Sequence, residues 1–376
     1  MYDDPSMQDF KRISFSDLTC ITSNTRSLEL PDERLSTETI NLIQSGIAHV
    51  GSVVVCRIES VGIDQSVENR WGELVPINPG DLIMGVMGNR QSTTSMYGGI
   101  PEHGIKLPRE GFIDLLSPGG VIGECLSCPS YLGSPTKLHI LGLAFQEGKP
   151  LEIVPWLRDE RLQALCPLIL VAGTSAEVGK TRFASKLISF LSHNSRWTVA
   201  ATKLAGVGDL EDLLKLRNSG AELIFDFVDA GLVTTYKVSE KVAVEVAKGI
   251  LNHLGKRKPG AIVAELGGDI LGANVPAILA DKEICNAASA MILVPSEIFA
   301  AYGALRYLED RGFPTNKVYI AQPKKNPETS QERARDILHC DLYDCEKEKD
   351  LASLVEKILG WRKKENSVKL HAAMTL

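Results

Sequence analysis

The sequence predicts an α/β protein in which a domain with a parallel sheet follows a small, mainly β domain of the barrel or sandwich type. From Cys166 onward, short apolar runs alternate with segments of helical periodicity, a pattern that places helices on both faces of a parallel sheet. Before residue 157, short β-rich runs lie between glycine and proline turns. The length of 376 residues also exceeds one ordinary domain. We expect a β-rich domain over 1–157, an α/β domain over 158–360 and a polar tail over 361–376.

The N-terminal part predicts strands that are separated by tight turns. The expected strands cover 53–58, 82–87 and 138–143, and Pro-Gly or Gly-Gly pairs punctuate the chain between them. A polar, glycine-bearing loop over 88–99 is long enough to contact a ligand, although an ordinary surface loop is the favoured interpretation. Arg90 is the candidate contact in this loop.

The C-terminal part predicts six strands and five helices in alternation. The strands are expected at 167–172, 198–203, 222–228, 261–266, 289–294 and 317–321, and the helices at 180–193, 209–219, 239–254, 297–310 and 328–338.

Composition narrows the range of functions. A net charge of −6 argues against nucleic acid as a partner, because phosphate-backbone binding favours a basic surface. The acidic N-terminus lacks the apolar core of a secretion signal, and no apolar run reaches the roughly 20 residues of a membrane span, so a cytoplasmic protein without membrane contact is expected. Cys125 and Cys128 have metal-type spacing but lack a second ligand pair, which favours free thiols over zinc.

A glycine-framed loop from Gly173 to Thr181 ends in Gly-Lys-Thr and lies between an apolar run and a helical pattern. Backbone N–H groups in such a loop, together with the positive end of the following helix, bind phosphate oxygens. Lys180 is expected to reach the terminal phosphates of a nucleotide, and the hydroxyl of Thr181 is expected to bind Mg²⁺. The candidate nucleotide-binding residues are Gly173, Thr174, Glu177, Val178, Gly179, Lys180, Thr181 and Arg182.

Three further candidates lie where strands of the expected sheet end. Lys203 ends the second strand beside the expected phosphate site, or forms a structural salt bridge with an acidic residue of 209–212. Glu265 follows four apolar residues at another strand end and is the first choice for holding Mg²⁺, with Asp269 behind it. Asp229 is a further candidate for the metal shell, so the predicted metal residues are Thr181, Glu265 and Asp229.

The loop resembles that of dethiobiotin synthetase, which likewise carries Glu-Val before Gly-Lys-Thr. The resemblance covers about 166–340 and also matches Lys203 and the Glu265–Gly268 strand end. It departs at Ser175 and over 203–208, which argues against the diamine substrate of that family but not against ATP chemistry. The segments 212–217 and 220–221 resemble the adaptor family that handles molybdopterin guanine dinucleotide and binds GTP.

These resemblances imply an ATP- and Mg²⁺-dependent enzyme that activates a small-molecule carboxylate or carbamate by phosphoryl transfer, in a ligase or cyclo-ligase reaction. Lys180, Lys203 and Glu265 are its expected catalytic residues. The alternatives are a nucleotide-binding adaptor or switch and a small-molecule kinase. No guanine signature follows the strand at 317–321, so ATP is favoured, with Gln322 and Asn326 as base contacts or turn residues. The first family also implies a homodimer.

Overall fold

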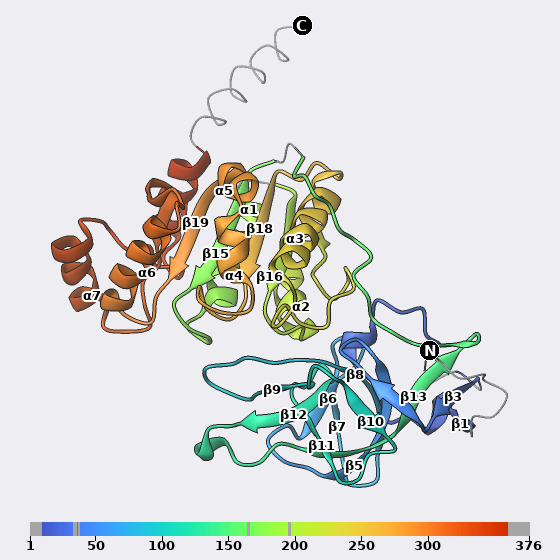
Figure 1. Ribbon diagram of the computed structural model, residues 1–376. Coiled ribbons are helices and arrows are strands. Elements are labelled where there is room, and N and C mark those ends of the chain that lie inside the picture. Colours follow the sequence, from blue (N-terminus) through green and yellow to red (C-terminus); the bar gives the residue numbers. More distant parts are fainter. Residues whose placement is uncertain (1–9, 33–35, 37, 164–165, 195–196, 360–376) are drawn as a thin grey trace, which may run out of the picture.

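The computed structural model describes residues 10–32, 36, 38–163, 166–194 and 197–359 and shows two domains, one rich in strands and one with helices around a sheet (Figure 1). The predicted tail at 361–376 lies outside the described residues. Among the helices of the described part of the chain, none combines the length and the apolar character that crossing a membrane requires.

The N-terminal domain is built around a barrel. A barrel and a sandwich are the two architectures that the sequence predicts for it. Its strands pair in a closed ring, in which each strand of the order β13, β5, β8, β12, β11 pairs with the next and β11 pairs again with β13. Their bounds are β5 Val53–Ser60, β8 Leu82–Met87, β11 Ile113–Leu115, β12 Val121–Ser127 and β13 Lys137–Gln146. Alternate side chains, such as Val54, Cys56 and Ile58, point into the ring and form its core.

Shorter elements extend the barrel. The remaining strands are β1 Phe10–Ser14, β2 Cys20–Ile21, β3 Thr39–Ile43, β4 Gly46–Ala48, β6 Ser66–Glu68, β7 Leu74–Pro76, β9 Tyr97–Gly99, β10 Ile105–Leu107 and β14 Lys149–Pro150. Short 3₁₀ turns cover Phe15–Asp17, Ser23–Thr25 and Ser130–Leu132 in this domain and Thr315–Lys317 in the next.

The C-terminal domain contains a six-stranded parallel sheet in the order β17-β16-β18-β15-β19-β20. The strands are β15 Leu168–Gly173, β16 Val199–Ala205, β17 Leu223–Ile224, β18 Ala261–Leu266, β19 Ala288–Val294 and β20 Val318–Ile320. Most of their residues are fully buried, because helices cover both faces, and this confirms the predicted fold class.

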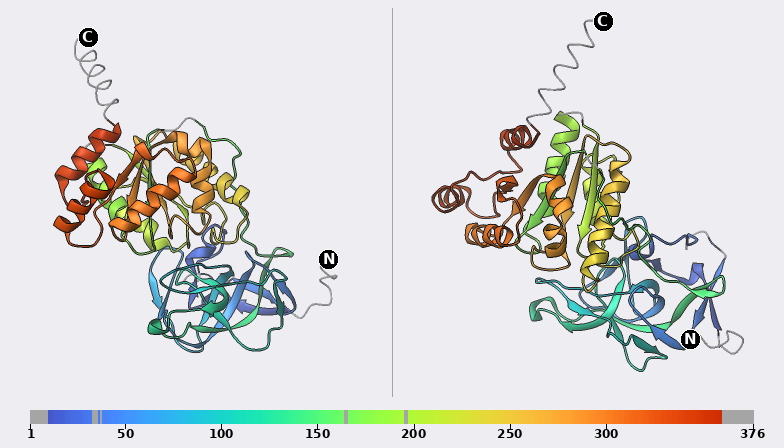
Figure 2. Two further views of the ribbon diagram at one scale, coloured as in Figure 1. Left: turned by 60° about the vertical axis from the view of Figure 1, so that its left-hand side comes forward. Right: turned by 45° about the horizontal axis from the view of Figure 1, so that its top comes forward.

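The helices divide between the two faces of the sheet (Figure 2). Side chains of α3, α4, α5 and α6 pack on one face, and those of α1, α2 and a helix over 348–359 pack on the other. The bounds are α1 Lys180–Asn194, α2 Leu210–Asn218, α3 Glu240–Gly255, α4 Val275–Ala280, α5 Lys282–Ala287, α6 Ile298–Asp310 and α7 Pro327–Arg333.

Five elements differ from the sequence prediction. The strand expected at 222–228 ends at Ile224, because the Asp226 carboxylate accepts bonds from the N–H groups of Val228 (2.8 Å) and Asp229 (3.2 Å) and turns the chain. The helix expected at 328–338 changes to π-helical geometry over Ala334–Leu338. The helices α4, α5 and 348–359 have no counterpart among the predicted elements.

Buried charges join the two domains. The guanidinium of Arg26 donates from Nε to Asp229 Oδ1 (2.8 Å) and also pairs with the Asp226 carboxylate. The Glu68 carboxylate accepts bonds from the N–H groups of Leu210 (2.6 Å) and Glu211 (2.7 Å) at the start of α2. A carboxylate at a helix N-terminus satisfies free N–H groups and the positive end of the helix dipole, so the barrel domain caps α2.

Replacing Glu68 by alanine is therefore expected to loosen the first turn of α2. Two N–H groups lose their acceptor, which at about 1–3 kcal/mol for each buried unpaired group predicts a loss of about 2–6 kcal/mol. Amide hydrogen exchange at Leu210 and Glu211 should accelerate accordingly. The control is Glu59→Ala, which removes a surface carboxylate that pairs with the exposed Arg57. Unchanged exchange in Glu68→Ala would contradict the capping role.

The Asp64 carboxylate lies near the same domain boundary. Its Oδ2 atom is buried and has no hydrogen-bond partner among the described residues. Burial raises the pKa of Asp64 to about 6, repulsion from Asp209 adds to the shift, and attraction to Arg90 opposes it. The folded protein thus favours the protonated acid.

For Asp64, the folded pKa lies above the unfolded value of about 3.9, so its contribution to stability is present at low pH and is lost as pH rises through about 6. Asp64→Asn should be more stable than the wild type by about 1–3 kcal/mol at pH 8, and only about a third of this advantage should remain at pH 4.5, which still lies above the unfolded pKa. Unfolding curves at both pH values test it, with the exposed Asp310→Asn as control. An advantage that is equal at both pH values would count against the shifted pKa.

Candidate functional site

The glycine loop, residues 173–181, connects the end of β15 to the start of α1. Gly179 has φ +106°, a conformation that favours glycine, and a side chain at Gly173 would come within 2.8 Å of Val178. Glu177 also has a positive φ of +58°, which is uncommon for a residue with a side chain. These conformations fold the loop tightly over the N-terminus of α1.

Lys180 ties the loop to the neighbouring strand end. Its ammonium group donates to the carbonyl oxygens of Ser175 (2.9 Å) and Gly268 (2.6 Å), and only 5% of the residue is exposed. Burial lowers the pKa of Lys180, while Glu265 opposes this shift. The lysine is held at the mouth of the loop, where its remaining donor can meet an anion.

Thr181 and Glu265 face one another below the loop. The Thr181 hydroxyl donates to Glu265 Oε1 (3.0 Å), whereas the buried Oε2 atom has no partner among the described residues. Burial and repulsion from Asp212 raise the pKa of Glu265, and the ammonium groups of Lys203 and Lys180 oppose this. An unpartnered carboxylate oxygen at 2% exposure is costly and points to a missing ligand.

Lys203, on β16, completes the group. Its ammonium donates to Asp212 Oδ2 (2.7 Å) and to the carbonyl of Val207 (2.9 Å). Burial opposes its charge, but the nearby Asp212 and Glu265 carboxylates outweigh burial and raise the pKa of Lys203. The structural salt bridge considered for this lysine therefore forms, with Asp212, and the pair still lines the same hollow as the glycine loop.

The hollow that these side chains surround has a volume of about 370 Å³. A further lysine reaches it from beyond β20, and sequence reasoning did not assign it a role. Lys324 donates to the carbonyl of Glu177 (3.3 Å), and its Cε lies 3.2 Å from the point where a side chain on Gly179 would begin. The sequence signal that could have indicated this lysine is the pair Lys324-Lys325, which follows the end of an expected strand.

Thr181 and Glu265 are the residues of the hollow that could bind a divalent cation. A hydroxyl and an unpartnered carboxylate oxygen are the oxygen ligands that Mg²⁺ prefers. Among the described residues there is no group of three or more His, Cys, Asp or Glu that could hold a metal. In proteins Mg²⁺ is usually held by one or two protein ligands together with substrate phosphates.

Two predicted residues lie outside the hollow. Asp229 accepts from Arg26 at the domain boundary, so the structure does not bring it together with Thr181 and Glu265. The guanidinium of Arg182 is half exposed and pairs with Glu346 (2.9 Å), so its side chain does not line the hollow.

The other candidates have structural partners. Thr174 Oγ1 accepts from the N–H of Ser296 (2.9 Å) and anchors the glycine loop beside β19. The Asp269 carboxylate accepts from the N–H of Leu271 (2.8 Å) in a turn. The side chain of Asn326 caps α7, which is the turn role considered for it, and Gln322 donates to the carbonyl of Pro323 (3.2 Å).

The barrel loop 88–99 contacts the site from the other domain. Thr94 donates to the carboxylate of Glu177 (3.1 Å), and the hydroxyl groups of Tyr97 and Tyr236 lie 3.4 Å apart. Arg90 donates to the carbonyl of Leu116 in its own domain. The loop thus touches the glycine loop through Thr94.

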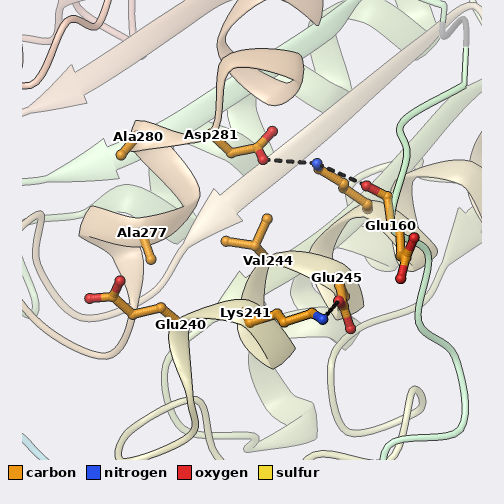
Figure 3. Close-up of a pocket in the computed structure, with 9 residues that line it drawn as sticks. Glu160, Glu240, Lys241, Val244, Glu245, Ala277, Ala280 and Asp281 are labelled. Carbon is orange, nitrogen blue, oxygen red and sulfur yellow. Dashed lines mark hydrogen bonds and ion pairs between the residues drawn. The ribbon is translucent and has the colours of Figure 1, made fainter.

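A separate hollow of about 550 Å³ lies beside α3 and α4 (Figure 3). Its Lys248 pairs with Asp281 and Glu283 at 2.8 Å each, and Lys241 lies 3.7 Å from Glu245. More carboxylates than ammonium groups line it, so it does not suit phosphate.

No protein-family model matches the chain, and no curated protein matches it. Solved structures with some similarity include a DUF1611 family protein from Anabaena variabilis, with 12% identity, a TM-score of 0.35, and coverage of 57% of this chain and 66% of that one. Another is the signal recognition particle 54 kDa protein of Aeropyrum pernix in complex with GDP. Its identity to this chain is 14% and its TM-score is 0.32, and the match covers 59% of this chain and 52% of that one. A third is a ParA family ATPase from Chlorobium tepidum, with 13% identity, a TM-score of 0.32, and coverage of 53% of this chain and 93% of that one. The match therefore spans less than two thirds of the first two of these proteins.

Proposed function

We propose that the glycine loop binds a nucleoside triphosphate together with Mg²⁺. One observation carries the proposal: the loop closes over a hollow into which three lysines converge beside Thr181 and the unpartnered oxygen of Glu265. Backbone N–H groups and lysines bind phosphate oxygens, whereas a hydroxyl and a carboxylate bind the cation that accompanies them.

The lysines then act electrostatically. Lys180 exchanges its carbonyl partners for terminal phosphate oxygens, and Lys324, which lies beside Glu177 and Gly179, adds a second positive charge. Lys203 remains charged because Asp212 holds it. In phosphoryl transfer most of the protein's contribution comes from positioning and from stabilising charge on the transferred group.

Thr181 and Glu265 would hold the cation, directly or through its water. When bound, Mg²⁺ neutralises charge that develops on the phosphate oxygens. The same cation would give Glu265 Oε2 a partner and would favour the ionised carboxylate, against the effect of burial.

We extend the proposal to the reaction that the resemblance implies. The protein transfers the terminal phosphoryl group of ATP to a carboxylate or carbamate of a small molecule, and the activated group then forms an amide or closes a ring. In this reaction a carboxylate oxygen attacks the terminal phosphorus, the bond between that phosphorus and its bridging oxygen breaks, ADP leaves, and an acyl or carbamoyl phosphate forms. An amine then attacks the activated carbonyl carbon and loses a proton, the bond from that carbon to the phosphate oxygen breaks, and inorganic phosphate leaves. A homodimer is part of the same proposal.

A second candidate, a nucleotide-dependent switch, is favoured by the contact between Thr94 of the barrel and Glu177 of the glycine loop. The release of ADP and GDP, with Mg²⁺ and a panel of small carboxylates and diamines, separates the candidates. The enzyme is expected to release ADP only with a particular metabolite, which mass spectrometry would show phosphorylated or cyclised. Slow release that no metabolite changes would support the switch, and absence of nucleotide binding would contradict both.

Lys180→Ala is expected to lower nucleotide turnover by at least about 100-fold, because the lysine contacts the charge that develops in the transition state. Its matched control is Lys186→Ala, six residues further along the same helix, where the lysine is half exposed and pairs with Glu346. Circular dichroism would show that both variants are folded. Turnover at the wild-type rate in Lys180→Ala would exclude the proposed site.

Glu265→Gln is expected to weaken Mg²⁺-dependent activity more than nucleotide binding without metal, because the amide oxygen carries no charge to hold the cation. Activity across a series of Mg²⁺ concentrations should show a midpoint that is raised by about tenfold or more. Nucleotide affinity measured in the presence of a chelator is the control. If both properties fall equally, Glu265 does not belong to the metal shell.

A further inference from the structure

A cavity of about 610 Å³ lies between the two domains, away from the glycine loop. The barrel domain supplies Arg26, Arg70 and Trp71, the connecting segment supplies Trp156, and the α/β domain supplies one face of α2 together with residues 224–229. None of these residues lines the hollow of the proposed nucleotide site. A ligand in this cavity would touch both domains at once.

Positive charge prevails in the cavity. Of its three arginines, Arg26 is neutralised by Asp226 and Asp229. Arg70 donates to the carbonyl oxygens of Leu30 (2.9 Å) and Pro31 (2.8 Å) and lies over the Trp71 ring, and among the described residues its Nε atom has no partner and it forms no ion pair.

The third arginine, Arg217, is exposed on α2, and it forms no ion pair within the part of the chain that the structure describes. Arg70 and Arg217 therefore leave two guanidinium groups without a carboxylate partner in one cavity. Such groups favour an anionic ligand, because guanidinium forms paired hydrogen bonds with carboxylate or phosphate.

Two tryptophans add an aromatic wall. Trp71 is 43% exposed and Trp156 is 59% exposed, although both line the same cavity. The Arg70 guanidinium carbon lies 5.4 Å from the centroid of the Trp71 ring, and the indole N–H of Trp156 donates to the carbonyl of Asp229 (2.8 Å), so both rings have partners that orient them. Exposed aromatic rings beside arginine are typical of binding surfaces, and a flat ring can stack against them.

Helix α2 separates this cavity from the proposed nucleotide site. Leu210, Leu213, Leu214 and Arg217 recur at helical spacing and line the cavity. Asp212 lies on the other side of the helix, where it holds Lys203. Because a helix is about 10 Å across, a molecule in the cavity cannot be the acceptor of a phosphoryl group from the hollow.

We propose that this interdomain cavity is a second binding site, for a small molecule that carries a flat aromatic ring and a carboxylate or phosphate group. The ring stacks beside Trp71 and Trp156, and the anionic group pairs with Arg217 and Arg70. The site goes beyond the nucleotide chemistry proposed above and does not depend on it.

Calorimetric titration with 2-naphthoate and its neutral isostere 2-naphthamide tests the proposal. The acid should bind the whole protein at least about tenfold more tightly than the amide, since a hydrogen bond to a charged group contributes about 1.5–3 kcal/mol. Arg217→Met should reduce this preference, with Arg70 supplying what remains, and Trp71→Leu should weaken both probes. Arg333→Met, which removes an exposed arginine on α7, is the matched control and should change neither.

Two further measurements separate this site from the proposed nucleotide site. Lys180→Ala should bind 2-naphthoate as the wild type does, and saturating ATP with Mg²⁺ should not displace the probe. Equal affinity for acid and amide, no binding of the acid, binding that Arg217→Met leaves unchanged, or displacement by ATP would each overturn the proposal. Failure of the proposed phosphoryl transfer would leave these outcomes unaffected.

Discussion

The cap that the Glu68 carboxylate forms on helix α2 is the contact on which the arrangement of the molecule depends. The carboxylate comes from the barrel domain, whereas the N–H groups that it accepts begin a helix of the other domain. The same helix presents Asp212 to Lys203 on one side and Arg217 to the interdomain cavity on the other. A single helix therefore joins the barrel, the proposed nucleotide site and the second cavity.

Buried ionisable groups at the proposed nucleotide site lower the stability of the folded protein. Glu265 is buried with one oxygen unpartnered, and burial raises its pKa, so the folded protein resists the charge that a cation would need. Lys180 shows the complementary effect, because burial lowers its pKa while carbonyl oxygens occupy its donors. Ionisable groups whose pKa values are shifted by burial gather at functional sites, since a bound ligand supplies the countercharge that the protein alone lacks.

Sequence reasoning predicted the parts of the fold that depend on local periodicity. Strand β18 has the predicted bounds, and the glycine loop lies between strand and helix as expected. Sequence reasoning failed where residues far apart in the chain determine which side chains meet. The partner of Asp229 is Arg26, 203 positions away in the chain, and Lys324 enters the hollow only because β20 lies at the sheet edge beyond β19. Neither relation leaves a periodic trace in the sequence.

The barrel domain contacts the glycine loop at Glu177. Glu177 holds a left-handed backbone conformation within the glycine loop, which costs free energy unless contacts maintain it, and its carboxylate accepts a bond from Thr94 of the barrel. Phosphate binding changes the charge beside this residue. Because the barrel also caps α2 through Glu68, any shift of the glycine loop that breaks the Thr94 contact must either be absorbed within loop 88–99 or reach the helix that holds Lys203.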